Sequence, residues 1–432
     1  MLILVLWMSV GLVALALYFA DSMTLEYQAA ANRTAGLAAE QAAEGVSRYV
    51  AWALLNLSTN GVLTTNTYFR CDALPVGESR VWILGRDTPA TAGVTPTKPV
   101  FNLVDEAGKL NLNRAGSNLL VYLPGMYADT AMAVMDWRQT NSTLMINYGS
   151  LGYEAKHGQY ETVDELRLVQ GITLPDLVGD DANRNGFQDP SERATSGSRG
   201  FFPGWLDYLT VYSREPNTHA DGTTLTNMSN RGQLLGLLSA AFGQARAQQA
   251  LNQLGFRGNA NPTIAGPLQF YLNSGLAQDE FERIAGELAS STNSFTYGRV
   301  NINTAPEAVL VALFMGSGVN EQTATSAAET LISYRRSNPN NLGSVAWLVT
   351  ALGRNHQVVT GLASRDRITT RSFQYSADVV AVGPGGRGYR RVRYVFDLSD
   401  GSPKIIHRQD LSRLGWALGD EVRERLLAGN IP

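Results

Sequence analysis

The sequence lacks the residue patterns on which most enzymes and disulfide-bonded scaffolds depend. It contains a single cysteine, Cys71, which excludes an intramolecular disulfide framework. It has no G-x-S-x-G nucleophile elbow, no Walker loop and no H-E-x-x-H motif. The histidines are scattered along the chain without metal-ligand spacing, at His157, His219, His356 and His407. We therefore expect a protein that is not an enzyme.

Charge and proline are both missing from the start of the chain. Residues 1–20, MLILVLWMSVGLVALALYFA, carry no charge, and no proline occurs before Pro75. A helix of that length spans about 30 Å, the thickness of the hydrocarbon core of a bilayer. Helix-forming residues then continue to Leu57. The sequence predicts one continuous helix, with a transmembrane part over 1–20 and a stem outside the membrane over 21–60.

This apolar start differs from a signal peptide in three ways. It has no basic residue at its beginning, its apolar core is long, and helix formers follow it instead of a cleavage site and a loop. We therefore expect a retained, single-pass anchor. Without a basic flank, the positive-inside rule does not decide the orientation. The missing flank is also what we expect if a short basic leader precedes Met1 in the full gene product.

The charges of the whole chain are nearly balanced. It has 35 Lys and Arg against 38 Asp and Glu, a net charge of −3 over 432 residues. This balance does not favour nucleic acid or an anionic surface as a partner. The length allows two or more domains, and the 42 glycines indicate a region rich in loops.

Strand-like runs occur at both ends of the region outside the membrane. Two lie at 80–84 and 99–104, and three lie near the C-terminus at 373–382, 389–398 and 404–408, with glycine-containing hairpin signals between them. No strands are expected in the long segment between. The pattern predicts an α+β fold, in which the long pilin-like helix packs on an antiparallel sheet made by 61–106 and 367–432, and a mostly helical domain is inserted between strands. We expect an amphipathic helix over 411–427 to cover an edge of this sheet or to join a partner.

The helical middle contains an internal repeat. GKLNLNRAGSNLLVYL begins at Gly108, GRVNINTAPEAVLVAL begins at Gly298, and each is followed by a turn and a second helical segment. Two related helix–turn–helix units are therefore predicted, over 107–215 and 298–366.

The segment between the two units, 216–297, is predicted to be a helical insertion. Helices are expected over 232–256 and 278–290 because apolar residues recur there at helical spacing. The polar residues of 217–230 predict a linker.

One loop matches the template of a calcium-binding loop. DANRNGFQDPSE, residues 181–192, fits D-x-[DN]-x-[DN]-G-x5-E at each specified position. Calcium takes about six to eight oxygen ligands on a tightly folded loop with glycine at the sixth position, here Gly186. The expected ligands are the side-chain oxygens of Asp181, Asn183, Asn185, Asp189 and Glu192, and the backbone carbonyl of Phe187. The alternative is a chance match in an Asx-rich surface turn.

The helix–turn–helix units also raise nucleic-acid binding as a second class of function. Helix–hairpin–helix modules bind phosphates through the backbone amides of a G-x-G hairpin, and 123–126 and 316–318 match such a hairpin in part. This mode of binding needs a basic surface. Near the first hairpin, Arg138 is offset by two aspartates, and near the second there is one pair, Arg335-Arg336. No nucleic acid is therefore the expected partner.

In combination these segments resemble the K-type minor pseudopilins of bacterial type II secretion, the GspK family. The resemblance runs over most of the chain and begins with the apolar start that continues into a long helix. Its motifs are VDEAGKLNLN at 104–113, DWR at 136–138, GQYETVDELRLVQGI at 158–172, YLTVYS at 208–213 and VNINTAPEAVL at 300–310.

The resemblance implies a fold, a role and a set of partners. It implies a pilin-like helix and sheet with an inserted helical domain, and a subunit that caps the tip of the pseudopilus. Such a subunit helps to initiate assembly for the export of folded proteins across the outer membrane. The implied partners are the I-type and J-type minor pseudopilins, other pseudopilus subunits, the inner membrane and, where a leader precedes the sequence, the prepilin peptidase. The implied location is the bacterial inner membrane, with a single span and a periplasmic ectodomain.

Some details agree with this family and others depart from it. No acidic residue precedes Asp21, as expected of a tip subunit that has no neighbour above it to neutralise. Some family members bind calcium in the helical domain, but the usual acidic continuation after 136–138 is replaced here by Gln139-Thr140-Asn141. The stretch 214–297 is also longer than usual. A minor pilin of a related type IV pilus or competence system, with DNA-binding helix–hairpin–helix units, is the alternative.

Overall fold

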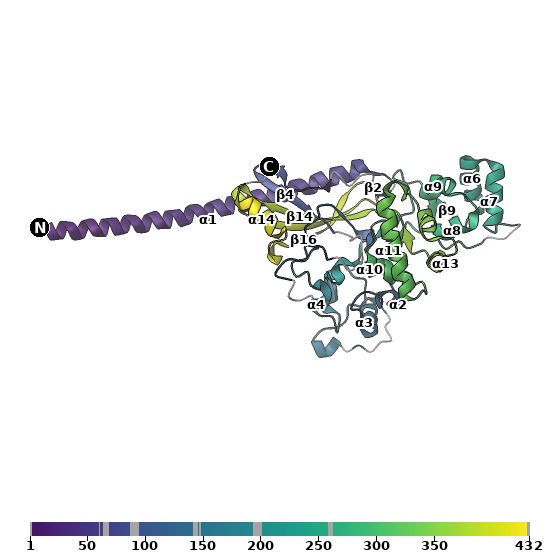
Figure 1. Ribbon diagram of the computed structural model, residues 1–432, viewed down its shortest axis with the longest axis horizontal. Helices are drawn as coiled ribbons and strands as arrows, with labels where there is room; N and C mark the ends of the chain where they lie inside the picture. Colours follow the sequence, from purple (N-terminus) through teal and green to yellow (C-terminus); the bar gives the residue numbers. More distant parts are fainter. Residues whose placement is uncertain are drawn as a thin grey trace.

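The computed structural model describes residues 2–59, 61–63, 69–86, 95–140, 146, 148–192, 201–257 and 262–429. Its longest element is α1, Leu2–Leu57, an unbroken helix of 56 residues whose N-terminal half projects from the rest of the molecule (Figure 1). Residues 2–21 are exposed, and the first buried residue of α1 is Ala35. The predicted continuous helix is confirmed, although Met1 and Asn60, at the limits of its two parts, lie outside the described residues.

The sheet combines strands from both ends of the ectodomain, as predicted. Its order is β16-β15-β14-β4-β3, and each neighbouring pair is antiparallel. The strands are β3 Leu74–Val76, β4 Ser79–Leu84, β14 Gln374–Val382, β15 Tyr389–Asp397 and β16 Lys404–Asp410. A separate two-stranded ribbon, β1 Ser58–Thr59 with β2 Val62–Leu63, follows α1.

The predicted strand at 99–104 is wrong. Phe101 makes one isolated bridge to Leu84, and β5 comprises Val104–Asp105 alone. The physical reason is space, because β4 already pairs with β14 from Asp378 to Val382 and leaves four residues of β14 on this side, of which β5 pairs with Tyr375 and Ser376. Most of the loop that the sequence places before this strand, 87–94, lies outside the described residues.

Helices cover both faces of the sheet. On one face, α1 buries Val46 and Val50 in a cluster with Val379. On the other face lies α14, Gly419–Leu427, whose Val422 packs with Trp82. The predicted helix over 411–427 is therefore shorter than expected and covers a face of the sheet, not an edge. It is interrupted by two glycines with positive φ, Gly415 and Gly419, after a short 3-10 turn, η9, at Ser412–Leu414.

The two repeat units have the same order of elements. In each, a two-residue strand leads into two helices, and a later two-residue strand pairs with the first in parallel. The first unit follows η2 Glu106–Gly108 and contains β6 Leu110–Asn111, α2 Ser117–Leu120, α3 Ala128–Arg138, η3 Tyr148–Leu151, η4 Val163–Leu168, α4 Leu174–Val178, η5 Trp205–Asp207 and β7 Leu209–Thr210. The second contains β12 Val300–Asn301, α10 Glu307–Met315, α11 Glu321–Ser337, η7 Pro339–Asn341, α12 Ala346–Leu352, α13 Gln357–Ala363 and β13 Ile368–Thr369. The expectation of no strands between the two ends is therefore wrong in detail.

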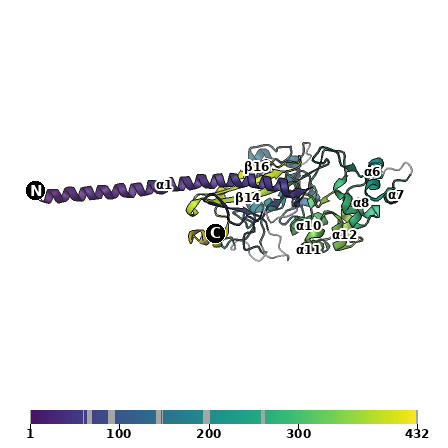
Figure 2. The same ribbon diagram turned by 90° about the horizontal axis from the view of Figure 1, so that it is seen from above.

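The segment between the units lies at the end of the molecule farthest from the N-terminus (Figure 1, Figure 2). Its elements are β8 Arg214–Pro216, β9 Thr226–Asn227, α6 Arg231–Phe242, α7 Gln244–Gln253, α8 Pro267–Ser274, α9 Gln278–Ile284, η6 Ala285–Glu287, β10 Leu288–Ala289 and β11 Phe295–Tyr297. The helix predicted over 232–256 is two helices separated at Gly243, where φ is +80°. The helix predicted over 278–290 ends at Ile284.

The predicted linker over 217–230 is wrong. Asn217, Leu225 and Met228 are buried, with exposed fractions of 7%, 6% and 0%. Polar side chains here form hydrogen bonds to the backbone of adjacent segments. The Asn217 amide, for example, donates to the carbonyl of Asn293 at 2.8 Å. The segment is therefore part of the packed helical domain.

The buried apolar side chains form three separate clusters. One lies in the helical domain and includes Leu112, Phe281 and Trp347, from both units and the segment between them. The other two lie on the α1 face and on the α14 face of the sheet. Within the described residues no cluster spans the sheet and the helical domain, so no shared apolar core joins these two parts.

Candidate functional site

The predicted calcium loop, 181–192, folds as a compact turn after α4. Gly186 has φ +88°, a conformation that favours glycine, at the sixth position of the loop. Asp181 accepts hydrogen bonds from the N–H groups of Asn185 and Gly186, both at 2.8 Å. Glu192 closes the loop by accepting from the N–H groups of Ala182 at 2.9 Å and Asp189 at 3.0 Å. The first and last predicted ligands therefore fix the same turn.

The other predicted side-chain ligands contact one another within this turn. The amides of Asn183 and Asn185 both donate to Oδ2 of Asp189, at 2.7 and 2.9 Å. The side-chain oxygens of Asn183 and Asn185 accept from the N–H groups of Asn185 and Phe187. The Phe187 ring is 2% exposed. All six predicted residues are thus brought into one loop.

Burial controls the electrostatics of the loop. It raises the pKa of the Asp181 carboxyl to about 7, although the nearby Arg86 guanidinium acts in the opposite direction. Burial also raises the pKa values of Asp189 and Glu192. The carboxylate of Asp420 adds to the rise for Asp189, and the carboxylate of Asp189 adds to the rise for Glu192. A cation held by these oxygens would favour their charged forms.

The donor set of the loop fits a hard divalent cation, because carboxylate, amide and carbonyl oxygens are the ligands that calcium takes. Among the described residues, no three or more His, Cys, Asp or Glu side chains form a group that could hold a metal on their own. A cation in this loop therefore needs the amide oxygens as well. Asn183 and Asn185 would have to turn their amide groups away from Asp189 to supply them. Calcium binding stays a prediction.

The contact of this loop with the sheet has no local sequence pattern. Arg391 on β15 pairs with Asp378 on β14 at 2.7 Å and donates to the carbonyl oxygens of Asn183 at 2.5 Å and Arg184 at 2.6 Å. The Asn183 amide reaches the carbonyl of Trp416 at 3.2 Å. Asn183 and Arg184 lie more than 200 positions from Arg391 and Trp416, so no local pattern could have predicted the contact.

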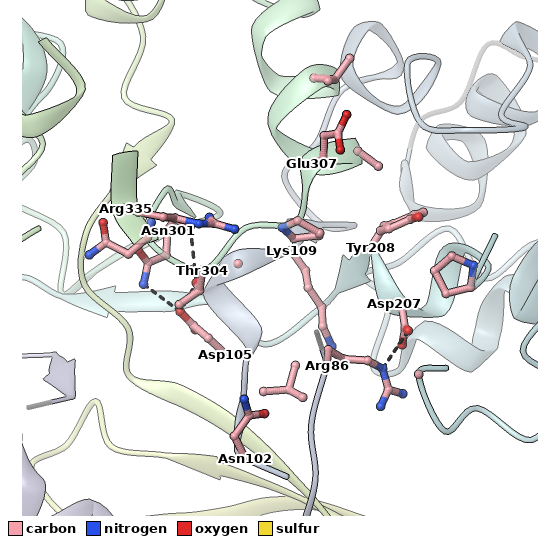
Figure 3. A pocket seen from close by; sticks show the side chains of 18 of the residues that line it. Arg86, Asn102, Asp105, Lys109, Asp207, Tyr208, Asn301, Thr304, Glu307 and Arg335 are labelled. Atoms are coloured by element: carbon pink, nitrogen blue, oxygen red, sulfur yellow. Dashed lines mark hydrogen bonds and ion pairs between the residues drawn. The ribbon is translucent and has the colours of Figure 1, made fainter. Parts of the chain in front are cut away.

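A cavity of about 1390 Å³ lies beside the loop, between the sheet and the two repeat units. Figure 3 shows Asp105 with Asn301 and Thr304 on one side and the Arg86–Asp207 ion pair on the other. Asp105 accepts from Asn301 at 2.7 Å and from Thr304 at 2.6 Å, and burial raises its pKa despite these donors.

Two basic groups that line this cavity are paired with carboxylates. Arg86 pairs with Asp207 at 2.8 Å, and Lys109 pairs with Glu106 at 2.8 Å. Glu307 and Glu321 also line the cavity, but nothing in its lining defines a reaction or a ligand, and we assign no chemistry to it.

The two hairpins examined for phosphate binding carry acidic residues. Asp129 lies in the first turn of α3 and Glu321 in the first turn of α11. In the first hairpin, the Pro124 carbonyl accepts a hydrogen bond from the Trp205 indole at 2.8 Å. Negative side chains at these helix N-termini oppose the binding of a phosphate.

Comparison with family models and with curated proteins found no match. Comparison with solved structures found a chain of the GspK-GspI-GspJ complex from the type 2 secretion system of enterotoxigenic Escherichia coli. The two chains share 10% sequence identity and have a TM-score of 0.31, over 90% of this chain and 98% of the other. A TM-score of this size carries no argument about function. The class that the chain's own fold defines is an α+β protein with a long, apolar N-terminal helix and an inserted helical domain.

Proposed function

We propose that this chain is a non-enzymatic minor pseudopilin of the K type, which caps the tip of a type II secretion pseudopilus and helps to initiate its assembly. In this role it is a single-pass protein of the bacterial inner membrane with a periplasmic ectodomain. The observation that carries the proposal is the division of α1 into an exposed N-terminal half, which carries no charge over residues 2–20, and a C-terminal half buried against the sheet.

The N-terminal half of α1 supports the membrane anchor. The described part of the chain contains one helix that is long and apolar enough to cross a membrane, and none of the most apolar window of this helix is buried. This exposed apolar helix has no partner among the residues that the structure describes, so lipid and neighbouring helices are its natural surroundings.

The position of the helical domain supports the place at the tip. This domain extends beyond the distal end of α1 in both views (Figure 1, Figure 2). In a filament built on parallel N-terminal helices, a subunit stacked above would meet this domain. The absence of an acidic residue before Asp21 agrees with a subunit that pairs with no terminal amine above it.

The stem between membrane and sheet supports assembly with other helices. Met23, Tyr27 and Leu37 have exposed fractions of 70%, 75% and 57%. These side chains lie outside the contact between α1 and the sheet. We assign them to neighbouring subunits, of which the I-type and J-type minor pseudopilins are the proposed first partners.

The alternative role in a DNA-binding pilus or competence system has less support. Phosphate binding at the hairpins is opposed by Asp129 and Glu321 at the helix N-termini. The net charge of −3 also offers little attraction to nucleic acid.

Copurification tests the proposed role. The full chain is expressed with full-length I-type and J-type minor pseudopilins of the same organism, extracted in detergent and analysed by size exclusion with light scattering. We expect a complex of defined stoichiometry, which a Tyr27→Asp variant weakens and a Tyr27→Phe variant preserves. If the three proteins elute separately with calcium present, the tip-capping role is wrong.

A structural calcium ion is part of the proposal. Its ligands are the oxygens of the loop at 181–192, and it requires no catalytic step. We expect calcium chloride at about 100 times the dissociation constant to stabilise the ectodomain by about 2.7 kcal/mol. The double variant Asp181→Ala, Glu192→Ala should lose this calcium-dependent rise in melting temperature. An unchanged rise would remove the loop as the site.

A further inference from the structure

The inserted helical domain contacts the sheet at the chain crossing, along β16 and at the loop at 181–192. Along β16, Gln409 donates to Asp164 at 2.9 Å, and the rings of Tyr212 and His407 lie 5.8 Å apart. The other two places carry most of the polar contacts.

The first of these two places is where the chain passes between the two parts. There Glu106 accepts from Ser376 on β14 at 2.7 Å, and Arg214 pairs with Asp397 at the end of β15 at 2.5 Å. Asp105 accepts at the same place from the Ser372 hydroxyl and from Asn301.

The second place is the loop at 181–192. Arg391 donates to the carbonyl oxygens of Asn183 and Arg184 while its guanidinium pairs with Asp378. Arg86, which follows β4, donates to the same Arg184 carbonyl at 3.0 Å.

Two further contacts extend this second place toward the C-terminus and the loop after β4. The Phe187 ring lies against Gly419 at the start of α14, where an added Cβ would come within 3.3 Å of it. The Gln188 N–H donates to the Pro96 carbonyl at 2.8 Å. One short loop therefore contacts several separate segments of the sheet domain.

The loop contacts the sheet far from the crossing, so its contacts can restrict rotation of the helical domain. Arg391 lies about 20 Å along β15 from Asp397, at about 3.3 Å per residue. The cavity of about 1390 Å³ lies between the two parts on this side, and no apolar cluster of the described residues bridges them. A domain held only where the chain crosses can rotate about that crossing, which is how hinges work. The loop supplies most of the contacts far from the crossing, next to the single hydrogen bond from Gln409 to Asp164, and so restricts this rotation.

We propose that the loop at 181–192 is a calcium-dependent clasp, which holds the inserted helical domain against the sheet when the ion is bound and loosens it when the ion is removed. This inference rests on the calcium site proposed above. It adds a conformational role for that site, beyond stabilisation of the loop itself.

The coupling follows from which atoms each partner uses. The proposed cation is held by the side chains of Asp181, Asn183 and Asn185. Arg391 instead contacts the backbone carbonyls of the same turn, those of residues 183 and 184. Fixing the side chains fixes the direction of these carbonyls. Arg184 has φ +59°, a strained conformation for a residue with a side chain. Without the ion, the turn is held only by its hydrogen bonds, so the carbonyls that Arg391 binds are held less firmly.

Hydrogen exchange on the full chain in detergent tests this clasp. Exchange is followed by mass spectrometry with calcium chloride and then with a chelator, and calcium binding is measured on the same sample by calorimetry. We expect calcium to slow exchange in 389–393 and 416–422 of the sheet domain by about tenfold, equivalent to about 1.4 kcal/mol. Exchange in α12, which is remote from the loop, should not change.

Two variants separate the clasp from the metal site. Glu192→Gln, which keeps the shape of the side chain, should abolish calcium binding and the protection of the sheet segments together. Phe187→Ala keeps the backbone carbonyl and should bind calcium while losing protection around Gly419. Asp221→Asn, on an exposed turn, is the matched control and should change neither.

Each outcome decides a different claim. Calcium binding with protection confined to 181–192 would overturn the clasp and leave the metal site intact. No calcium binding at millimolar concentration would overturn both the metal site and the clasp. The role at the pseudopilus tip is tested separately by copurification.

Discussion

The pair formed by Asp378 and Arg391 joins the two central strands and also receives the loop from the helical domain. The exposed fractions of the two side chains are 3% and 0%. Burial alone would raise the pKa of Asp378, but Arg391 and Arg393 outweigh it and hold this pKa well below its usual range. Removal of a charge from such a pair leaves the other charge buried without compensation, which is costly.

We expect Asp378→Asn to lower the free energy of unfolding by about 3–5 kcal/mol at pH 7. Because the folded pKa is depressed, the stabilisation by Asp378 is fully present above the unfolded pKa and is lost as the pH falls toward the folded pKa. The difference between wild type and variant should therefore shrink by about 1.4 kcal/mol per pH unit below about pH 4. Urea unfolding at several pH values measures it, and a constant difference would contradict this assignment.

Local signals predicted the long helix and the β14–β15–β16 hairpins, because each depends on residues close in sequence. The short strands β6, β7, β12 and β13 escaped prediction, since two residues leave no periodic pattern. The pairing of β14 with both β4 and β5 could not be predicted either. These two strands are separate in the sequence but lie along the same edge of β14. The loop at 181–192 could be identified from its spacing, but its contact with Arg391 depends on the completed fold.

The repeated sequence is also a repeated packing arrangement. Arg335 of α11 donates to the carbonyls of Ile302 at 3.2 Å and Ala305 at 2.8 Å. In the first unit Arg138 of α3 donates in the same way to the equivalent carbonyls, of Leu112 and Ala115. In each unit an arginine of the second helix thus binds the turn before the first helix.

We expect Arg335→Met to lower the free energy of unfolding by about 1–3 kcal/mol, because it leaves buried carbonyl groups without their donor. The neighbouring Arg336 is exposed, so Arg336→Met is the matched control and should change stability by less than about 0.5 kcal/mol. Thermal or chemical unfolding measures both. Equal effects of the two substitutions would show that the shared arginine contact does not stabilise the unit.

The molecule as a whole has two parts, an anchor and an ectodomain, and α1 belongs to both. All the buried residues of α1 lie from Ala35 onward, against the sheet, whereas its first half contacts no core residue. The anchor and the ectodomain should therefore respond independently to substitution, although one continuous backbone connects them.

This independence predicts a specific effect of a charge in the anchor. Leu12 has an exposed fraction of 65%, so Leu12→Asp removes no contact within the folded ectodomain. A carboxylate near the middle of a membrane helix costs about 2.5–3.5 kcal/mol on insertion scales. We expect Leu12→Asp to shift the chain from the carbonate-resistant membrane fraction to the soluble fraction and to abolish the complex with other pseudopilins. The melting temperature of its ectodomain should match that of Leu12→Ile, which should stay in the membrane. If Leu12→Asp lowered that melting temperature, the first half of α1 would belong to the folded core; if it stayed fully membrane-bound and supported secretion, this segment would not be the anchor.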